Sequence, residues 1–89
     1  MELPYEEKQI SDRNFIREFK QNTDSGDLTW HRDRESRIVV SKYPTNWTIQ
    51  LDNQLPRNLN EKVLIPMGMW HRLIKGDGDL TIEIIKLIN

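Results

Sequence analysis

The sequence predicts a small all-β domain, an antiparallel sandwich or barrel that follows one short N-terminal helix. From residue 27 onward, about seven short segments rich in β-branched and aromatic residues alternate with turn-forming residues. Seven strands in about 60 residues leave no room for the crossover helices that a parallel sheet requires. The residues before this region show helical spacing of their apolar side chains instead.

The helix is expected over residues 10–22, ISDRNFIREFKQN. Ser11 is a suitable N-cap residue, and Phe15, Ile16 and Phe19 would share one apolar face. The turn-forming NTDSGD would end the helix. Because a helix of this length is marginally stable alone, its phenylalanine face should pack on the rest of the domain.

The strands should form the remainder of a single domain. With 89 residues, we expect an N-terminal arm and helix over residues 1–25 and a barrel over residues 26–89. The last strand is apolar on both faces, which predicts a central position or a partner against it. The expected strands cover residues 28–33, 37–43, 47–52, 54–59, 62–66, 69–75 and 80–88.

Composition excludes several classes of function. The chain has 13 Lys and Arg against 14 Asp and Glu, so its charge offers no argument for nucleic-acid binding. It has no cysteine, which excludes thiolate metal sites and fits a reducing compartment. Neither a signal peptide nor an apolar run long enough to span a membrane is present. We therefore expect a soluble, cytoplasmic protein without a membrane partner.

The tripeptide Trp-His-Arg occurs twice and contains both histidines of the chain, His31 and His71. Side chains alternate across a strand, so His31 should share a face with Asp33. If the two strands meet with their histidines inward, two imidazoles and one carboxylate converge in an arrangement that suits a divalent transition metal such as Fe, Mn, Ni or Zn. The alternative is that each histidine is an ordinary polar residue on a half-exposed strand.

A turn precedes the second histidine. Pro66 cannot donate to a sheet, and Gly68 permits the positive φ of a tight turn. This segment resembles the second motif of small single-domain cupins, RmlC-like jelly rolls, in which a glycine, five residues, Pro-x-Gly and two residues precede a metal-ligating histidine. Asn60 replaces the leading glycine, and Lys75 stands where an asparagine is usual.

The first cupin motif is degenerate here. It usually has a glycine, five residues, His-x-His, three or four residues and a glutamate, followed by a later glycine. This chain has Gly26, four residues, His31, Arg32 and Asp33, while Arg37 or Ile38 occupies the glutamate position. The resemblance covers about residues 26–88 and implies a double-stranded β-helix jelly roll.

The resemblance implies specific site residues. By position, His31 and His71 would ligate the metal, and Asp33 would be a conservative replacement for a third ligand. Arg37 could instead pair with Asp33 and remove it from coordination. Glu35 could serve as a substitute carboxylate. Without a metal, the same residues, including Glu35 and Arg37, would bind a small anionic ligand.

The two tryptophans of the repeated tripeptide, Trp30 and Trp70, should lie on the face opposite the histidines. An outward indole needs a cover, which the helix, another sheet or a second subunit could supply. The tendency of cupin-like domains to dimerise adds weight to a homodimer.

Three functions follow as hypotheses. The first is a small metal-dependent cupin that acts on or binds a small organic molecule. The second is a non-catalytic barrel that binds or senses a small ligand without metal. The third is a structural or regulatory homodimer whose pocket is vestigial. Fold alone does not choose among these, and whether the protein is an enzyme stays open.

Overall fold

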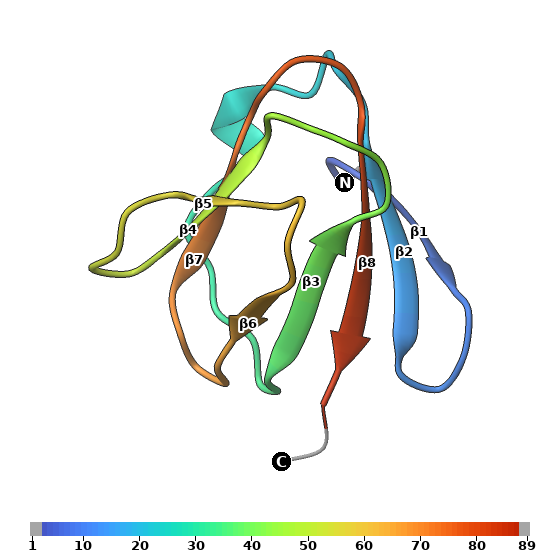
Figure 1. Ribbon diagram of the computed structural model, residues 1–89, viewed down its shortest axis with the longest axis vertical. Coiled ribbons are helices and arrows are strands. Elements are labelled where there is room, and N and C mark those ends of the chain that lie inside the picture. Colours follow the sequence, from blue (N-terminus) through green and yellow to red (C-terminus); the bar gives the residue numbers. More distant parts are fainter. Residues whose placement is uncertain (1–2, 88–89) are drawn as a thin grey trace.

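Two antiparallel β-sheets face one another in a computed structural model that describes residues 3–87 (Figure 1). The larger sheet has the order β1-β2-β8-β3-β6, and the smaller has the order β5-β4-β7. The strands are β1 (Glu6–Gln9), β2 (Asn14–Phe19), β3 (Arg37–Ser41), β4 (Thr48–Leu51), β5 (Arg57–Asn58), β6 (Val63–Ile65), β7 (His71–Ile74) and β8 (Leu80–Lys86).

The expected helix over residues 10–22 is wrong, because this region forms the turn after β1 and then strand β2, which pairs antiparallel with β1. Ser11 lies in the turn between them and caps no helix. Phe15 and Phe19 lie on the same face of β2, as two residues separated by an even number must. All six residues of β2 pair with β8, so the backbone of this segment is satisfied by a sheet ladder. Among residues 3–87 the only helical element is a short 3₁₀ turn, Ser25–Asp27.

The central position of the last strand is confirmed. β8 lies between β2 and β3 in the larger sheet, as Figure 1 shows. Its inward residues Leu80, Ile82 and Ile84 are buried, and the residues between them are partly exposed. A strand with neighbours on both sides needs apolar side chains toward the core and tolerates them on its outer face.

The core lies between the two sheets. Trp47, Ile49 and Leu51 alternate into it from the region of β4, and the Trp47 indole donates to the Gly78 carbonyl at 3.0 Å. A satisfied N–H lets a large aromatic side chain be fully buried. The buried apolar residues are Phe19, Val39, Trp47, Ile49, Leu51, Leu59, Val63, Ile65, Leu80, Ile82 and Ile84.

Two expected strands are largely absent. Of residues 28–33 only His31 pairs with β7, through one isolated bridge, and residues 54–59 contribute only the two residues of β5. Pro56 interrupts the latter segment, because proline cannot donate to a ladder. No helix in the described part of the chain is long and apolar enough to cross a membrane.

Candidate metal centre

The two histidines lie directly opposite one another. His31 and His71 form an antiparallel bridge in which each backbone N–H donates to the other's carbonyl, at 3.0 and 2.9 Å. Residues paired in this way project their side chains on the same face. Their rings are accordingly 4.2 Å apart between centroids. The bridge therefore turns two histidines 40 positions apart in sequence into neighbours in one wall of the barrel.

The same bridge arranges the residues beside the histidines. Because the two Trp-His-Arg segments run in opposite directions, each tryptophan faces the arginine of the other segment. Arg72 lies 4.8 Å from the ring centroid of Trp30, and Arg32 lies 5.0 Å from that of Trp70. These are cation–π distances. The expected helix does not cover the indoles, which are 39% and 43% exposed and carry an arginine instead.

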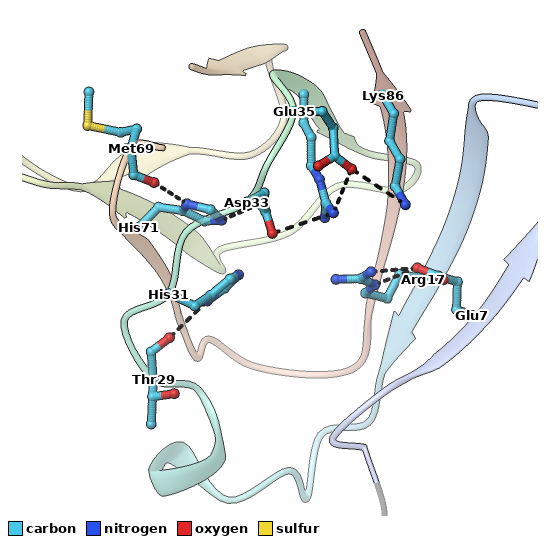
Figure 2. A network of polar contacts seen from close by, with 10 residues as sticks. Glu7, Arg17, Thr29, His31, Asp33, Glu35, Met69, His71 and Lys86 are labelled. Carbon is cyan, nitrogen blue, oxygen red and sulfur yellow. Dashed lines mark hydrogen bonds and ion pairs between the residues drawn. The ribbon is translucent and has the colours of Figure 1, made fainter. Parts of the chain in front are cut away.

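Each imidazole is held by its own backbone. The Nδ1 atom of His31 lies 3.0 Å from the Thr29 carbonyl, and that of His71 lies 2.8 Å from the Met69 carbonyl (Figure 2). A carbonyl only accepts, so in both rings Nδ1 carries the proton. In the neutral rings Nε2 is then the atom with a free lone pair. This is the arrangement in which a metal-binding histidine is usually found.

The turn before β7 positions the carboxylate. Gly68 has a φ of 78°, as a tight turn at this residue requires, and its N–H donates to the Asp33 carbonyl at 2.9 Å. The next contact of this turn is from the Met67 N–H to the Ser36 hydroxyl at 3.0 Å. The Pro66–Gly68 turn thus ties the segment that carries Asp33 to the segment that carries His71.

The two oxygens of Asp33 have different surroundings. Oδ1 lies 3.4 Å from Nη2 of Arg37, as the sequence allowed. Oδ2 lies 3.3 Å from Nε2 of His71 and is buried without a hydrogen-bond partner. A neutral His71 presents a lone pair to this oxygen, so the contact is favourable only if a proton or a cation lies between the two atoms.

The donor atoms are of types that suit a divalent cation, and they lie near one another. One ligand atom from each of His31, Asp33 and His71 can be chosen so that all lie within 4.8 Å of one another. Ligands at about 2.0–2.2 Å from a transition metal are separated by about 3 Å or slightly more, close to the His71 to Asp33 distance. Two Nε2 lone pairs and one orphaned carboxylate oxygen are the donor types that Fe, Mn, Ni and Zn accept. The three predicted residues could therefore hold a metal.

The two predicted ligand-binding residues form the next part of the network. Arg37 lies between two carboxylates, 3.4 Å from Asp33 and 3.1 Å from Glu35. Glu35 also lies 3.6 Å from Nζ of Lys86. Arg37 lines the cavity described below, whereas Glu35 does not. Figure 2 shows this chain of contacts from His71 to Lys86.

The electrostatics favour the metal-competent forms of two residues. Burial of the Asp33 carboxyl opposes its ionisation, but the contact with His71 and the charge of Arg37 outweigh this and lower its pKa. Partial desolvation against the neighbouring ring lowers the pKa of His31, although part of this residue stays exposed. Asp33 is therefore ionised and His31 neutral at neutral pH.

A cavity of about 270 Å³ opens in front of these residues, between the two sheets. Its apolar walls come mainly from Val39, Ile65, Ile82 and Ile84. A few convergent polar groups in an otherwise apolar cavity are typical of small-molecule sites. The polar and charged residues that line it are Tyr5, Arg17, Thr29, His31, Asp33, Arg37 and His71.

The architecture matches solved structures at low sequence identity. An RmlC-like cupin family protein with a double-stranded β-helix fold from Methanocaldococcus jannaschii has a TM-score of 0.66 and 13% identity over 92% of this chain and 76% of its own. This chain has the cupin fold. The resemblance inferred from its two cupin-like motifs is thereby confirmed, and the barrel has the double-stranded β-helix fold.

Two further solved structures have a similar fold. DMSP lyase DddQ from Ruegeria pomeroyi has a TM-score of 0.79 and 12% identity over 97% of this chain, which spans 48% of the lyase. KdgF from a Halomonas species has a TM-score of 0.71 and 12% identity over 99% of this chain and 84% of its own. No protein-family model matches the sequence, and no curated protein matches it significantly.

Sequence reasoning did not place Arg17 and Tyr5 at the cavity. Arg17 was assigned to the helix and lies instead on the inner face of β2, and Tyr5 lies just before β1. Glu7 pairs with Arg17 at the rim. The signal that could have found Arg17 is the alternation of Phe15, Arg17 and Phe19, which places an arginine between two inward aromatic residues.

Proposed function

We propose that this protein is a small cupin that binds a divalent transition metal, Fe, Mn, Ni or Zn, through His31, Asp33 and His71 and presents it to a small organic molecule. The observation that carries the proposal is the combination of two Nε2 lone pairs, freed by the Nδ1 contacts, with the buried unpartnered Oδ2 of Asp33. A bound cation would satisfy all three atoms at once.

The bound ion would supply Lewis acidity toward a ligand oxygen. The protein's own residues would do the rest. The backbone carbonyls of Thr29 and Met69 keep both rings in the ligating tautomer, and Arg37 holds Asp33 through Oδ1 while Oδ2 stays available. The apolar walls limit water around the ligand, and Glu35 keeps Arg37 in place at the cavity.

A second function has one observation in its favour. Arg37 lies 3.4 Å from Asp33, so the carboxylate is already partly neutralised without any metal. On this basis the alternative is a non-catalytic barrel that binds or senses a small anion. The two functions differ in whether stoichiometric metal is present.

Metal analysis of protein purified without a histidine tag tests the first function. After reconstitution with each metal at pH 8, we expect about one equivalent per chain. His31→Ala and His71→Ala should each lose it, and Asp12→Asn, which removes an exposed carboxylate in the β1–β2 turn, should retain it. Wild-type protein with less than about a tenth of an equivalent of every metal contradicts the proposal.

We also propose that the protein is a cytoplasmic homodimer. The cytoplasmic location rests on the absence of cysteine from the composition. The dimer rests on the outer face of the larger sheet, where Ile38 pairs with Leu64 on one side and with Ile85 on the other. These three side chains form one apolar row, and Leu64 is 51% exposed.

A further inference from the structure

We infer that Arg17 makes this cavity selective for small carboxylic acids. In this arrangement the carboxylate binds Arg17, and an oxygen at the other end of the ligand lies at the His31, Asp33 and His71 cluster. The inference rests on the proposed metal site for the second contact. The first contact depends only on Arg17 and its surroundings.

Arg17 occupies an unusual position for a charged residue. It lies on the inner face of β2, between Phe15 and Phe19, and it lines the cavity with only 13% of its side chain exposed. A guanidinium inside a barrel is costly unless it is paired or used. Such a placement needs a reason beyond packing, because an apolar residue would fill the same position more favourably.

The contacts of Arg17 hold it in place without consuming all of its donors. Its Nε and Nη2 atoms both donate to a single oxygen of Glu7, with the Nε distance at 2.9 Å. Its guanidinium carbon lies 3.9 Å from the ring centroid of Tyr5. No hydrogen bond between residues 3 and 87 uses Nη1, and Figure 2 shows this end of Arg17 pointing across the site toward His31. One N–H of Nη1 and the second N–H of Nη2, which lie parallel in the guanidinium plane, are thus available to a planar acceptor such as a carboxylate.

The charge of the cavity also favours an anion. The lining includes two arginines, Arg17 and Arg37, against the single carboxylate of Asp33. The Nε atom of Arg37 is buried without a hydrogen-bond partner, which adds a second unused donor. Glu7 and Glu35 compensate the arginines from outside the lining. A divalent cation would add two positive charges, so a neutral or cationic ligand would leave the cavity with excess positive charge.

The size and the walls limit the ligand further. A volume of about 270 Å³ corresponds to roughly nine water molecules, which restricts the ligand to a few carbon atoms with polar ends. Val39, Ile82 and Ile84 lie along the larger sheet and would contact an apolar middle. The chemical class is therefore a short carboxylic acid whose second oxygen function lies at the far end.

A series of linear dicarboxylates from oxalate to glutarate tests the inference by calorimetric titration into Zn²⁺-loaded protein. We expect one chain length to bind best, because the spacing between Arg17 and the metal ligands is fixed by the sheets. Replacing one carboxylate of that compound by an amide should weaken binding about tenfold or more in wild-type protein, a comparison that needs no variant. Arg17→Gln should weaken the dicarboxylate by a similar factor and leave the monoamide nearly unchanged.

Matched variants separate recognition from a structural role. Glu7→Gln breaks the same ion pair as Arg17→Gln but leaves the guanidinium free, so dicarboxylate binding should become tighter. If the pair were merely structural, both variants would change binding in the same direction. Arg17→Lys keeps the charge without the planar pair of donors and should bind with intermediate affinity. Lys20→Gln removes a positive charge from an exposed pair with Glu18 and should have no effect.

Failure of this inference is distinguishable from failure of the metal site. If Zn²⁺ binds stoichiometrically but Arg17→Gln changes dicarboxylate affinity by less than twofold, the carboxylate assignment is overturned and the proposed function stands. If no metal binds, titration of the metal-free protein still tests Arg17. Binding that Arg17→Gln weakens at least fivefold would then support the anion site, and equal binding by both proteins would overturn it.

Discussion

The carboxylate of Asp33 contacts Arg37 through one oxygen and His71 through the other. Its Oδ1 atom is within ion-pair distance of Arg37, and its Oδ2 atom is left for the histidines. The charge of Arg37 stabilises the ionised carboxylate that a metal requires but also repels the metal itself. Under the proposed function, Arg37, one of the two residues at the position of the glutamate in the cupin motif, would therefore affect metal affinity only indirectly.

Arg37→Gln should increase the affinity for Zn²⁺, because it removes a positive charge near the site while Asp33 remains. A repulsion of about 1.4 kcal/mol, modest for a partly solvated site, corresponds to a tenfold change. Asp33→Asn should act in the opposite direction by at least a hundredfold. Competition titrations against a chelator would measure both. Weaker binding by Arg37→Gln would show that its hold on the Asp33 side chain matters more than its repulsion of the metal.

His31 gives the metal-free protein a specific dependence on pH. Because burial lowers its pKa in the folded state, the unfolded chain takes up a proton first as the pH falls below about 6.5. The stabilisation is fully present above this value and is lost as the pH falls through the folded-state pKa. The lowered pKa of Asp33 contributes stability that is fully present above about 3.8 and is lost only as the pH falls below this value, outside this window.

Denaturant titrations at pH 7.5 and 5.5 check this dependence. The free energy of unfolding of the wild type should be smaller at pH 5.5. His31→Gln has no imidazole to titrate at this position. Its free energy of unfolding should therefore fall less between pH 7.5 and pH 5.5 than that of the wild type. An equal loss in both proteins would rule out His31 as the source.

The N-terminal segment shows at the scale of single elements why part of the fold was predictable and part was not. Apolar residues at 15, 16 and 19 match a helical period, whereas the strand places Phe15, Arg17 and Phe19 on one face. An inward arginine breaks the alternation that identifies a half-buried strand. The same inward arginine therefore explains both the wrong helix and the missed cavity residue.

The histidine segments were easier to predict because the period of a strand depends on no partner. His31 and Asp33 share the cavity face as expected, and the tryptophans lie on the other. The antiparallel bridge was not predictable, since the pairing of residues 31 and 71 depends on the turn at Gly68 and on the contacts of distant strands. Sequence patterns identify faces, and tertiary structure determines which faces meet.

The connection between β7 and β8 crosses from one sheet to the other and depends on two glycines for different reasons. A Cβ atom on Gly76 would lie 2.6 Å from the Trp47 backbone nitrogen, so Gly76→Ala should destabilise the protein by about 3 kcal/mol or more. Gly78 has open space but a φ of 73°, so Gly78→Ala should cost about 1–2 kcal/mol.

Thermal and chemical unfolding would measure these two glycine variants, with Gly26→Ala as a control. At Gly26 the nearest atom to an added Cβ is the Asp24 side-chain oxygen at 3.4 Å, an ordinary contact. Its effect should stay below that of the other two. A smaller loss for Gly76→Ala than for Gly78→Ala would show that the loop holding Trp47 moves aside at little cost.

The inner and outer faces of the barrel differ in what they contain. The inner faces of both sheets form the core and the cavity, so the proposed metal and anion sites would make no use of the outer face of the larger sheet. That face carries the apolar row of Ile38, Leu64 and Ile85, which a monomer would leave partly in water. Placing a second copy there would cover the row without closing the cavity.

Size-exclusion chromatography with light scattering should therefore give twice the 10.7 kDa mass of one chain. Ile38→Glu places a charge at the centre of the row and should yield a monomer, because burying an unpaired carboxylate opposes association. Leu55→Glu is the matched control, since Leu55 is 84% exposed between β4 and β5 and lies outside the row. Metal content should be the same in both variants, because neither residue lines the cavity. If the dimer persists in Ile38→Glu but dissociates in Trp70→Glu, the interface lies on the tryptophan face instead. If the wild type is a monomer at high concentration, both arrangements are excluded.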